Sequence, residues 1–290
     1  MGSLNQSYVF VYGTLRKHES NHDLMKDATL IACQAWTKGS LFDTGLGYPA
    51  LKESMYDKVY GEIYLVSEEQ LHRLDELEDY RPNDKNNLYN RKKQVVFYDT
   101  GKIEAFLYFI SEHHEPILKN RIESGDWKLY RLVKTKQPIL YFAYGSCMDD
   151  VRFKLHDKNH LFQNVKGHGI LNGYSLRFTI KFENGGRADI VEEGGSVEGK
   201  VYEIIPECFE YLYKREGVSA DWYRPTFVDL HLNGKMVEDV LTFTVVNKKA
   251  ETAPPSDYLE EIIRGGSGFL SKSYLSSLKE RMKSTFGIEC

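Results

Sequence analysis

Two glutamates, Glu78 and Glu216, each follow a short segment with helical periodicity. Each lies seven residues after an apolar residue, Leu71 or Phe209, and seven residues make nearly two turns of an α-helix, so we expect both carboxylates on the apolar faces of their helices. Burial disfavours the charged form of a carboxyl group and raises its pKa toward neutrality, which suits a general acid–base catalyst. For either glutamate alone, a helix-end side chain in solvent is the simpler interpretation, but the same placement in both halves favours a catalytic carboxylate.

A strand-like apolar run ends at a Tyr-Gly pair in each half of the chain. The sequences at these two points are Tyr12-Gly13-Thr14-Leu15 and Tyr144-Gly145-Ser146-Cys147. Successive backbone N–H groups in such a loop can hold a carboxylate or a developing oxyanion. A glycine at the end of a strand more often only makes a turn, so the loops become informative through their pairing with the two glutamates.

The two halves of the chain repeat in register. Three landmarks recur at one offset (188 − 50, 199 − 61 and 216 − 78 are all 138), and the pairs are Ala50 and Ala188, Gly61 and Gly199, and Glu78 and Glu216. The Tyr-Gly pairs lie 132 residues apart (144 − 12), so the second copy is about six residues longer near its front. Solenoid repeats span only about 20–50 residues, so a repeat of this length predicts tandem domains.

Length agrees with two domains, because 290 residues suffice for two hydrophobic cores. We expect the first domain at residues 1–130 and the second at 137–290, with the join near 124–137. Helical periodicity is confined to 68–77, 207–214 and a C-terminal segment from Pro254-Pro255 to about residue 282. β-Branched and aromatic runs predict strands at 8–12, 58–66, 94–98, 104–110, 139–144, 196–205, 226–232 and 239–246, and Asn233-Gly234 between the last two predicts a hairpin turn. Strands outnumber helices and adjoin one another, which favours an α+β fold with a mostly antiparallel, barrel-like sheet.

The composition excludes several classes of partner and site. A formal net charge of −4 gives no reason to expect nucleic acid or an anionic membrane as a partner. No apolar run approaches the ~18 residues that span a bilayer, and the N-terminus lacks a secretory pattern. The four cysteines lack Cys-x-x-Cys spacing, which argues against a disulfide framework and a zinc site: Cys33, Cys147, Cys208 and Cys290. We expect a cytoplasmic protein, and the sequence leaves its oligomeric state open.

Both halves resemble the γ-glutamylcyclotransferase-like superfamily, whose members carry an opening Tyr-Gly-Ser/Thr loop and a later catalytic Glu. The segment Leu74-Asp75-Glu76-Leu77-Glu78-Asp79-Tyr80 is similar to the Glu segment of that family, and so is Tyr213-Lys214-Arg215-Glu216-Gly217-Val218. Tyr89 and Arg91 follow the first segment, and Tyr223 and Arg224 follow the second. The resemblance implies that Glu78 and Glu216 are catalytic and that Tyr89 and Tyr223 belong to the substrate sites. It also implies two tandem domains, each a small, mainly antiparallel β-barrel with a few short helices.

The two halves resemble different branches of the superfamily. The first half resembles the shorter AIG2-like branch. Its strand Ala105-Phe106-Leu107-Tyr108 supplies a tyrosine, Tyr108, at a position that this branch places near the cavity. The second, with Ala253-Pro254-Pro255-Ser256-Asp257-Tyr258, resembles the glutathione-pathway cyclotransferases, in which the position of Tyr258 belongs to the substrate pocket. The layout is similar to tandem-domain cyclotransferases of bacteria.

The resemblance implies a cyclising acyl transfer on a small γ-glutamyl amine or peptide. The α-amine attacks its own γ-carbonyl group, and 5-oxoproline and a free amine or amino acid are released. One carboxylate of near-neutral pKa can take the proton and then deliver it, so neither a metal nor an organic cofactor is implied. Two alternatives remain: a non-catalytic module that binds a small carboxylate, and a pair of domains of which one is catalytic and the other degenerate.

Three further features bear on the sites. Glutathione-type relatives have Asn where this chain has Cys147, and a thiol donates more weakly than an amide. We interpret Cys147 as a small buried residue rather than a nucleophile, because no particular His is placed to activate it. Arg187 lies where the family lines its pocket and is a candidate carboxylate clamp. His113-His114 predicts a solvated loop rather than a metal site, because adjacent side chains on a strand face opposite ways.

Overall fold

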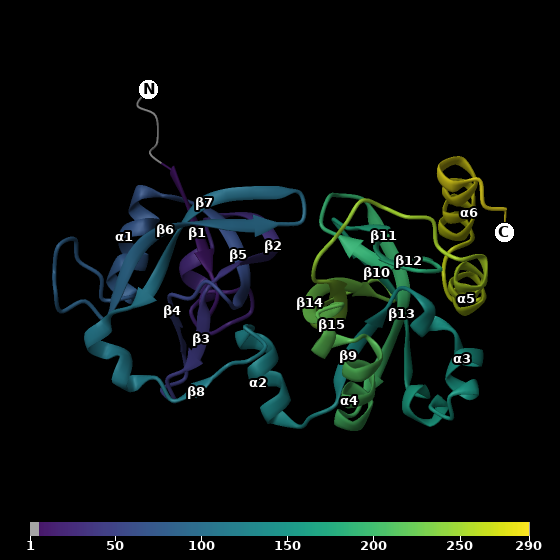
Figure 1. Ribbon diagram of the computed structural model, residues 1–290, viewed down its shortest axis with the longest axis horizontal. Helices are drawn as coiled ribbons and strands as arrows, with labels where there is room; N and C mark the ends of the chain where they lie inside the picture. The colour runs from purple at the N-terminus through teal and green to yellow at the C-terminus, as the bar shows by residue number, and fades with distance from the viewer. Residues whose placement is uncertain (1–5, 290) are drawn as a thin grey trace. The chain divides into compact units, whose positions relative to one another are not determined.

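A computed structural model of the chain describes residues 6–289, and the chain divides into two compact units between Lys134 and Thr135 (Figure 1). Each unit is built around a closed five-stranded barrel with short helices. This confirms the expected α+β class and the two barrel domains of the same kind.

The first barrel has the strand order β1-β5-β2-β6-β7, and a parallel pairing of β1 with β7 closes it. All its other pairings are antiparallel. The barrel strands are β1 (Gln6–Val11), β2 (Thr29–Lys38), β5 (Lys58–Ser67), β6 (Tyr89–Tyr98) and β7 (Gly101–Ile110). A separate three-stranded sheet has the order β4-β3-β8 and contains β3 (Ser40–Asp43), β4 (Pro49–Lys52) and β8 (Asn120–Arg121).

Short helices complete the first unit: η1 (His22–Met25), α1 (Glu68–Leu77), η2 (Glu112–Ile117) and α2 (Trp127–Thr135). Helix α1 begins at a capping box, in which Ser67 Oγ accepts from Gln70 N at 3.2 Å and Gln70 Oε1 accepts from Ser67 N at 2.9 Å. Helix η2 contains His113-His114, so that pair lies in a short 3₁₀ helix rather than in the expected loop.

The second barrel repeats the arrangement of the first. Its cyclic order is β9-β13-β10-β14-β15, and β9 and β15 form the one parallel pairing. The strands are β9 (Ile139–Ala143), β10 (Val165–Asn172), β13 (Ser196–Ile204), β14 (Tyr223–Leu232) and β15 (Lys235–Val245), with the hairpin β11 (Ser175–Phe182) and β12 (Gly185–Val191) beside them. The helices are η3 (Ser146–Met148), α3 (Asp150–Leu155), η4 (Asn159–Phe162), α4 (Pro206–Arg215), η5 (Val218–Ala220), α5 (Ser256–Gly266) and α6 (Lys272–Phe286).

Matching contacts in the two barrels explain why landmarks recur in the sequence. The Tyr12 hydroxyl donates to the Tyr108 carbonyl at 2.6 Å, and the Tyr144 hydroxyl donates to the Phe243 carbonyl at the same distance. A Cβ added to Gly61 would lie 2.2 Å from a carbonyl oxygen of β1, and one added to Gly199 would lie 2.3 Å from a carbonyl oxygen of β9. Glycine at these two positions therefore allows the opening strand of each barrel to approach its neighbour.

The element bounds agree with the predicted strands and helices to within a few residues at most ends. Helix α1 has the predicted bounds, and α4 gains Pro206 at its first position, where the absent N–H costs nothing. Asn233 and Gly234 both have positive φ (50° and 84°) and connect β14 to β15 as a hairpin turn of the predicted kind. The C-terminal helical segment extends to Phe286, a few residues beyond its expected end.

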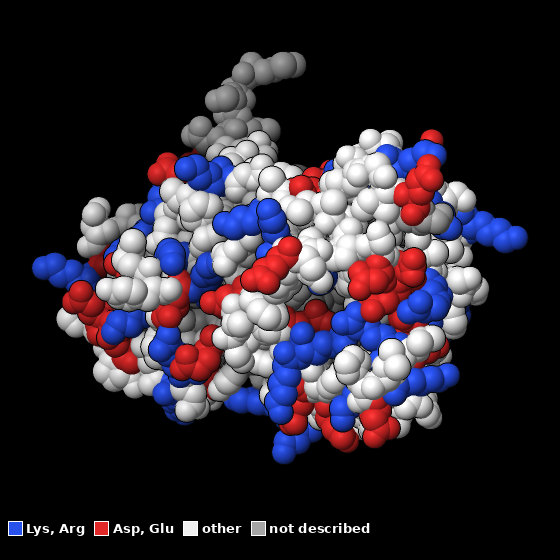
Figure 2. Space-filling model, turned by 45° about the vertical axis from the view of Figure 1, so that its right-hand side comes forward, with Lys and Arg blue, Asp and Glu red and all other residues white. Residues whose placement is uncertain are grey.

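The distribution of charged side chains, the apolarity of the helices and the state of the cysteines complete the description of the fold. On the face shown in Figure 2, acidic and basic side chains are interspersed. Among residues 6–289, no helix has both the length and the apolarity needed to cross a bilayer. Cys33, Cys147 and Cys208 are free thiols, and Cys290 lies outside the described residues.

Candidate active sites

The first unit contains a cavity of about 200 Å³ at the end of strand β1. All seven site residues predicted in this half line it: Tyr12, Gly13, Thr14, Leu15, Glu78, Tyr89 and Tyr108. The rest of its wall was not predicted from the sequence: Phe10, Val11, Asn21, Tyr48, Pro49, Leu77 and Leu88. The structure thus brings the Tyr-Gly loop and the glutamate to one cavity.

The Tyr-Gly loop is shaped by a close contact and a side-chain brace. A Cβ on Gly13 would lie 2.7 Å from the Pro49 ring, so a larger residue would displace the loop from the wall. Asn21 braces the loop, because its backbone N–H donates to the Thr14 carbonyl at 2.9 Å and its side-chain amide donates to Thr14 Oγ1 at 3.0 Å. Asn21 is therefore a residue that shapes the site without any signal in the sequence pattern.

Glu78 lies one residue beyond α1, as its C-cap. Asp79 then adopts a left-handed conformation (φ 48°), and the Tyr80 N–H donates to the Asp75 carbonyl at 2.8 Å, which ends the helix as a Schellman motif does. The Glu78 side chain is half-buried, and burial raises its pKa to about 7. The described residues that line the cavity include neither Lys nor Arg, so no cation in this wall opposes the effect of burial.

Three of the four tyrosines of this cavity, Tyr12, Tyr89 and Tyr108, donate their hydroxyl protons within the protein. The Tyr89 hydroxyl donates to the Pro49 carbonyl at 3.2 Å, and the Tyr108 hydroxyl donates to Asp75 Oδ1 at 2.8 Å. Burial raises the pKa of Tyr12, Tyr89 and Tyr108 far above the ordinary value of 10.0. These phenols stay protonated at neutral pH, so among the pocket groups with a resolved pKa shift only Glu78 titrates near neutrality.

The second unit contains two adjoining cavities that share four wall residues: Ser146, Glu216, Tyr223 and Tyr258. The inner cavity, of about 40 Å³, adjoins the second Tyr-Gly loop, and its remaining wall is Tyr141, Tyr144, Gly145, Cys147, Ala188 and Phe243. The outer cavity, of about 260 Å³, is completed by Arg152, Phe182, Arg187, Arg215 and Trp222. Every site residue predicted in this half therefore lines one cavity or both.

Glu216 occupies the same place as Glu78 but has charged and polar neighbours. It is the C-cap of α4, and Gly217 follows in a left-handed conformation (φ 62°). Its side chain is 17% exposed, and the guanidinium Nε of Arg215 lies 3.7 Å from its Oε1. Burial raises the pKa of Glu216, and the charge of Arg215 and a hydrogen bond from Cys147 act in the opposite direction.

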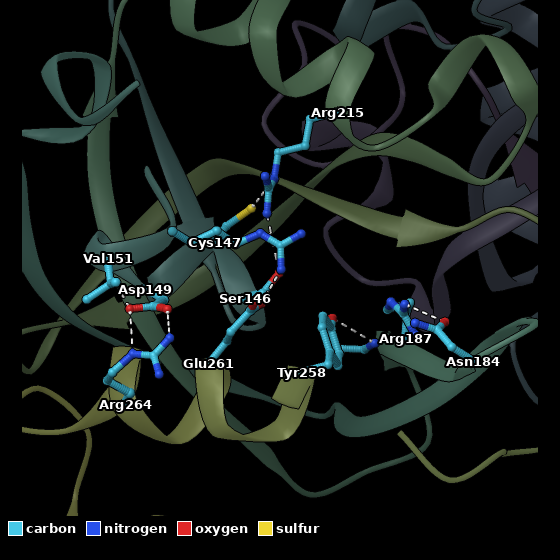
Figure 3. A network of polar contacts seen from close by, with 12 residues as sticks. Ser146, Cys147, Asp149, Val151, Asn184, Arg187, Arg215, Tyr258, Glu261 and Arg264 are labelled. Atoms are coloured by element: carbon cyan, nitrogen blue, oxygen red, sulfur yellow. Dashed lines mark hydrogen bonds and ion pairs between the residues drawn. The ribbon is translucent and has the colours of Figure 1, made fainter. Parts of the chain in front are cut away.

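Cys147 is buried as expected, and it also contacts Glu216 and Arg215; Figure 3 shows the contact with Arg215. Its thiol donates to Glu216 Oε1 at 3.3 Å and accepts from Arg215 Nε at 3.2 Å. Burial raises the pKa of the Cys147 thiol, and the nearby Glu216 raises it further, whereas Arg215 lowers it. The thiol is therefore protonated at neutral pH and acts on Glu216 as a weak hydrogen-bond donor.

Tyr223 and Tyr258 form one wall of the second site by holding the backbone of Ala188. The Tyr258 hydroxyl accepts from the Ala188 N–H at 3.1 Å, and the Tyr223 hydroxyl donates to the Ala188 carbonyl at 2.7 Å. Arg187 lies over the Tyr258 ring, with 4.9 Å between its guanidinium carbon and the ring centroid. In Figure 3, Arg187 lies beside Tyr258 and Asn184.

Comparison with known proteins identifies the family of both halves of the chain. The family described as "Gamma-glutamyl cyclotransferase, AIG2-like" matches residues 9–129, and the AIG2-like family matches residues 196–278. A relative from Bacillus subtilis (strain 168), named "Putative gamma-glutamylcyclotransferase YkqA", is 44% identical over 96% of this chain and 98% of its own length. This chain belongs to the γ-glutamylcyclotransferase-like, AIG2-like family.

Two further findings place the chain within this family. The crystal structure of YkqA from Bacillus subtilis is similar over 97% of this chain and 98% of its own, with a TM-score of 0.87 and 43% identity. A protein of Niallia circulans named "Gamma-L-glutamyl-butirosin B gamma-glutamyl cyclotransferase" is 44% identical over 45% of this chain and 81% of its own length. The tandem arrangement is therefore shared with a family member of nearly equal length.

Proposed function

We propose that this protein is a γ-glutamylcyclotransferase that releases 5-oxoproline and a free amine or amino acid from a small γ-glutamyl substrate. The observation that carries the proposal is Glu78: its pKa is raised to about 7 by burial, and it lines the same cavity as the Tyr-Gly loop. A carboxyl group with that pKa is half-ionised at neutral pH and can serve as both base and acid. The relative named for γ-L-glutamyl-butirosin B supports a γ-glutamyl compound as substrate.

The proposed reaction needs two proton transfers through Glu78, the loss of a second proton from the ring nitrogen, and one oxyanion. The Glu78 carboxylate takes a proton from the α-ammonium group, and the freed amine attacks the γ-carbonyl carbon to form the ring C–N bond. The backbone N–H groups of Gly13, Thr14 and Leu15 stabilise the oxyanion that develops on the γ-carbonyl oxygen. When the intermediate collapses, the bond to the leaving nitrogen breaks as the Glu78 carboxyl group returns its proton to that nitrogen. The ring nitrogen loses its second proton, which the released amine takes up to become an ammonium ion.

Glu216 has the same role in the second site under this proposal. It lines both cavities of that site, and the loop Gly145-Ser146-Cys147 lines the inner one. Ring closure within one substrate molecule needs correct folding of the substrate more than a strong nucleophile, so the aromatic walls of Tyr223 and Tyr258 would contribute by holding it in the cyclising conformation.

The first site argues against a module that only binds a carboxylate. A carboxylate-binding site ordinarily supplies a cation, and the described wall of the first cavity contains Glu78 but neither Lys nor Arg. A carboxylate there would repel a ligand that is only anionic, whereas a γ-glutamyl substrate also brings an α-ammonium group to Glu78. The arrangement suits a group that exchanges a proton with its substrate.

The function is tested by incubating wild-type protein with γ-glutamyl amines, γ-glutamyl dipeptides and glutathione. We expect equal amounts of 5-oxoproline and of the free amine or peptide, and both are measured by mass spectrometry. Release of glutamate instead of 5-oxoproline would indicate hydrolysis by water and would contradict the cyclising mechanism. Thermal stabilisation by these compounds without any turnover would support the binding module.

A further inference from the structure

The two candidate sites differ in the charge of their walls. In the first cavity, the wall residues are a carboxyl group, tyrosines and uncharged side chains. In the second site, three arginines line the outer cavity with Glu216: Arg152, Arg187 and Arg215. Two sites of common origin therefore present opposite electrostatic environments to a substrate.

Two of the three arginines lie next to a carboxylate of the protein. Arg152 forms an ion pair with Glu261, and Arg215 lies beside Glu216 and donates to Cys147 and Ser146. Their charges are thus partly balanced by carboxylates of the second unit. This leaves Arg187 as the arginine to consider as a ligand for substrate.

The contacts of Arg187 hold its guanidinium group without neutralising it. Nη1 donates to the carbonyls of Gly185 at 3.2 Å and Gly186 at 3.1 Å, and Nη2 donates to Asn184 Oδ1 at 2.7 Å. The group also stacks on the rings of Phe182 and Tyr258, at 5.4 and 4.9 Å. Each partner is uncharged. A guanidinium group has five N–H donors, so this one keeps donors and its full charge for a carboxylate.

The arginines lie on the leaving-group side of the site. The Tyr-Gly loop, which would hold the γ-carbonyl group, lines the inner cavity, whose described wall has no arginine. Arg187 lines the outer cavity, and Glu216 lines both. A substrate whose reacting carbonyl contacts the loop and whose leaving nitrogen faces Glu216 would extend its leaving group into the outer cavity, toward Arg187.

We propose, on the basis of the function proposed above, that the second site selects γ-glutamyl substrates whose leaving group carries a carboxylate, and that Arg187 is the residue that selects them. The first site, without a cation in its described wall, takes γ-glutamyl amines whose leaving group is uncharged or cationic. The tandem chain would then serve two classes of γ-glutamyl compound with one chemistry.

The test compares γ-glutamylglycine with γ-glutamylglycinamide, which differ only in the charge of the leaving group. Both carry the same α-carboxylate on the γ-glutamyl part. In full-length Glu78→Gln protein, where only the second site can work, we expect kcat/KM to favour γ-glutamylglycine by about tenfold or more, the value of a charge-assisted hydrogen bond. In Glu216→Gln protein, we expect no preference for γ-glutamylglycine.

Substitution of Arg187 assigns the preference to one side chain. In the Glu78→Gln background, Arg187→Gln should reduce the ratio of kcat/KM for γ-glutamylglycine to that for γ-glutamylglycinamide about tenfold. Arg177→Gln is the matched control, because Arg177 lies on β11 of the same hairpin, outside the described walls of both cavities, and pairs with Glu193 and Glu251. It should leave the ratio unchanged.

Several results would overturn the proposal. If Arg187→Gln lowers kcat/KM equally for both substrates, Arg187 binds the shared α-carboxylate. If the Glu78→Gln protein has equal kcat/KM for the two substrates, selection by charge is excluded, even if Arg187→Gln fails to fold. Neither result would affect the proposed function, because 5-oxoproline would still be formed. If folded wild type forms none from either substrate, both the function and this inference are wrong.

Discussion

Replacement of Glu78 by Gln should stabilise the first unit at alkaline pH. The pKa of Glu78 is raised from an ordinary value of 4.5 to about 7, so the folded chain holds its proton more tightly than the unfolded chain. Stability contributed by this group is therefore complete below pH 4.5 and is lost as pH rises through about 7. Gln resembles the protonated carboxyl group in shape and does not ionise, so the variant avoids this loss.

The size of the effect follows from the same two values. One pKa unit corresponds to about 1.4 kcal/mol, so the difference between 4.5 and about 7 sets an upper bound of about 3.5 kcal/mol at pH values well above 7. Because the Glu78 side chain is half-buried rather than fully enclosed, we expect the variant to gain about 1–3 kcal/mol at pH 8 and close to nothing at pH 4.5.

Urea unfolding of wild type and Glu78→Gln at pH 4.5 and pH 8 measures this difference. Glu76→Gln is the matched control, since Glu76 is an exposed carboxylate of the same helix, and its substitution should change stability similarly at both pH values. A Glu78→Gln variant that is no more stable than wild type at pH 8 would show that this carboxylate is well solvated. The argument for Glu78 as a base of near-neutral pKa would then fail.

Three further predictions follow from the two sites. In Glu216→Gln protein, kcat/KM for 5-oxoproline release should rise with pH to a plateau, with a midpoint near 7, because the Glu78 base must be ionised; a pH–rate profile with a midpoint near 4.5 would contradict this. In Glu78→Gln protein, Cys147→Ala should move the midpoint of the pH–rate profile to higher pH, because the thiol hydrogen bond lowers the pKa of Glu216. Arg215→Gln should move this midpoint further, because the charge of Arg215 lowers the pKa of Glu216 more than the thiol does, and unchanged pH–rate profiles would refute both expectations. Gly61→Ala should destabilise the first unit by about 3 kcal/mol, because the new Cβ would lie 2.2 Å from a carbonyl oxygen of β1. Differential scanning calorimetry should therefore show a lower melting temperature for the variant, and an unchanged melting temperature would contradict the close approach of the two strands.

The repeat allowed much of the fold and most of the site to be predicted. Glu78 and Glu216 each follow a short amphipathic helix, and each lies at the same distance in sequence from the glycine of its barrel, Gly61 or Gly199. This equal spacing indicates that both halves form the same barrel. The hairpin turn at Asn233 was visible because it depends on local backbone conformation alone. Features that rest on local sequence or on repetition are therefore readable without a structure.

Other elements were missed because contacts distant in sequence define them. Strand β2 has two irregularities in its register with β5, between Leu30 and Ala32 and between Ala32 and Ala35, which break the alternation of buried and exposed residues. Helix α2 occupies most of the basic stretch marked as the join, and its Trp127 is buried in the core of the first barrel. A basic composition conceals such a helix, since a single buried face suffices to dock it.

The wall residues show the same limit. Arg215 directly precedes Glu216, so its position next to the glutamate carried some signal. Asn21 and Arg152 had none, because each reaches its cavity through a 3₁₀ turn or a short helix with no periodicity of its own. The charge contrast between the two sites consequently became visible only when the walls were assembled in space.

The most direct test of the central claim is 5-oxoproline release by wild type and by the double variant Glu78→Gln/Glu216→Gln. If the two glutamates are the acid–base catalysts, the double variant should be folded and should lose at least about 100-fold in kcat/KM, while each single variant retains the activity of one site. A folded double variant that releases 5-oxoproline at the wild-type rate would contradict the account. The proton transfers would then belong to other groups.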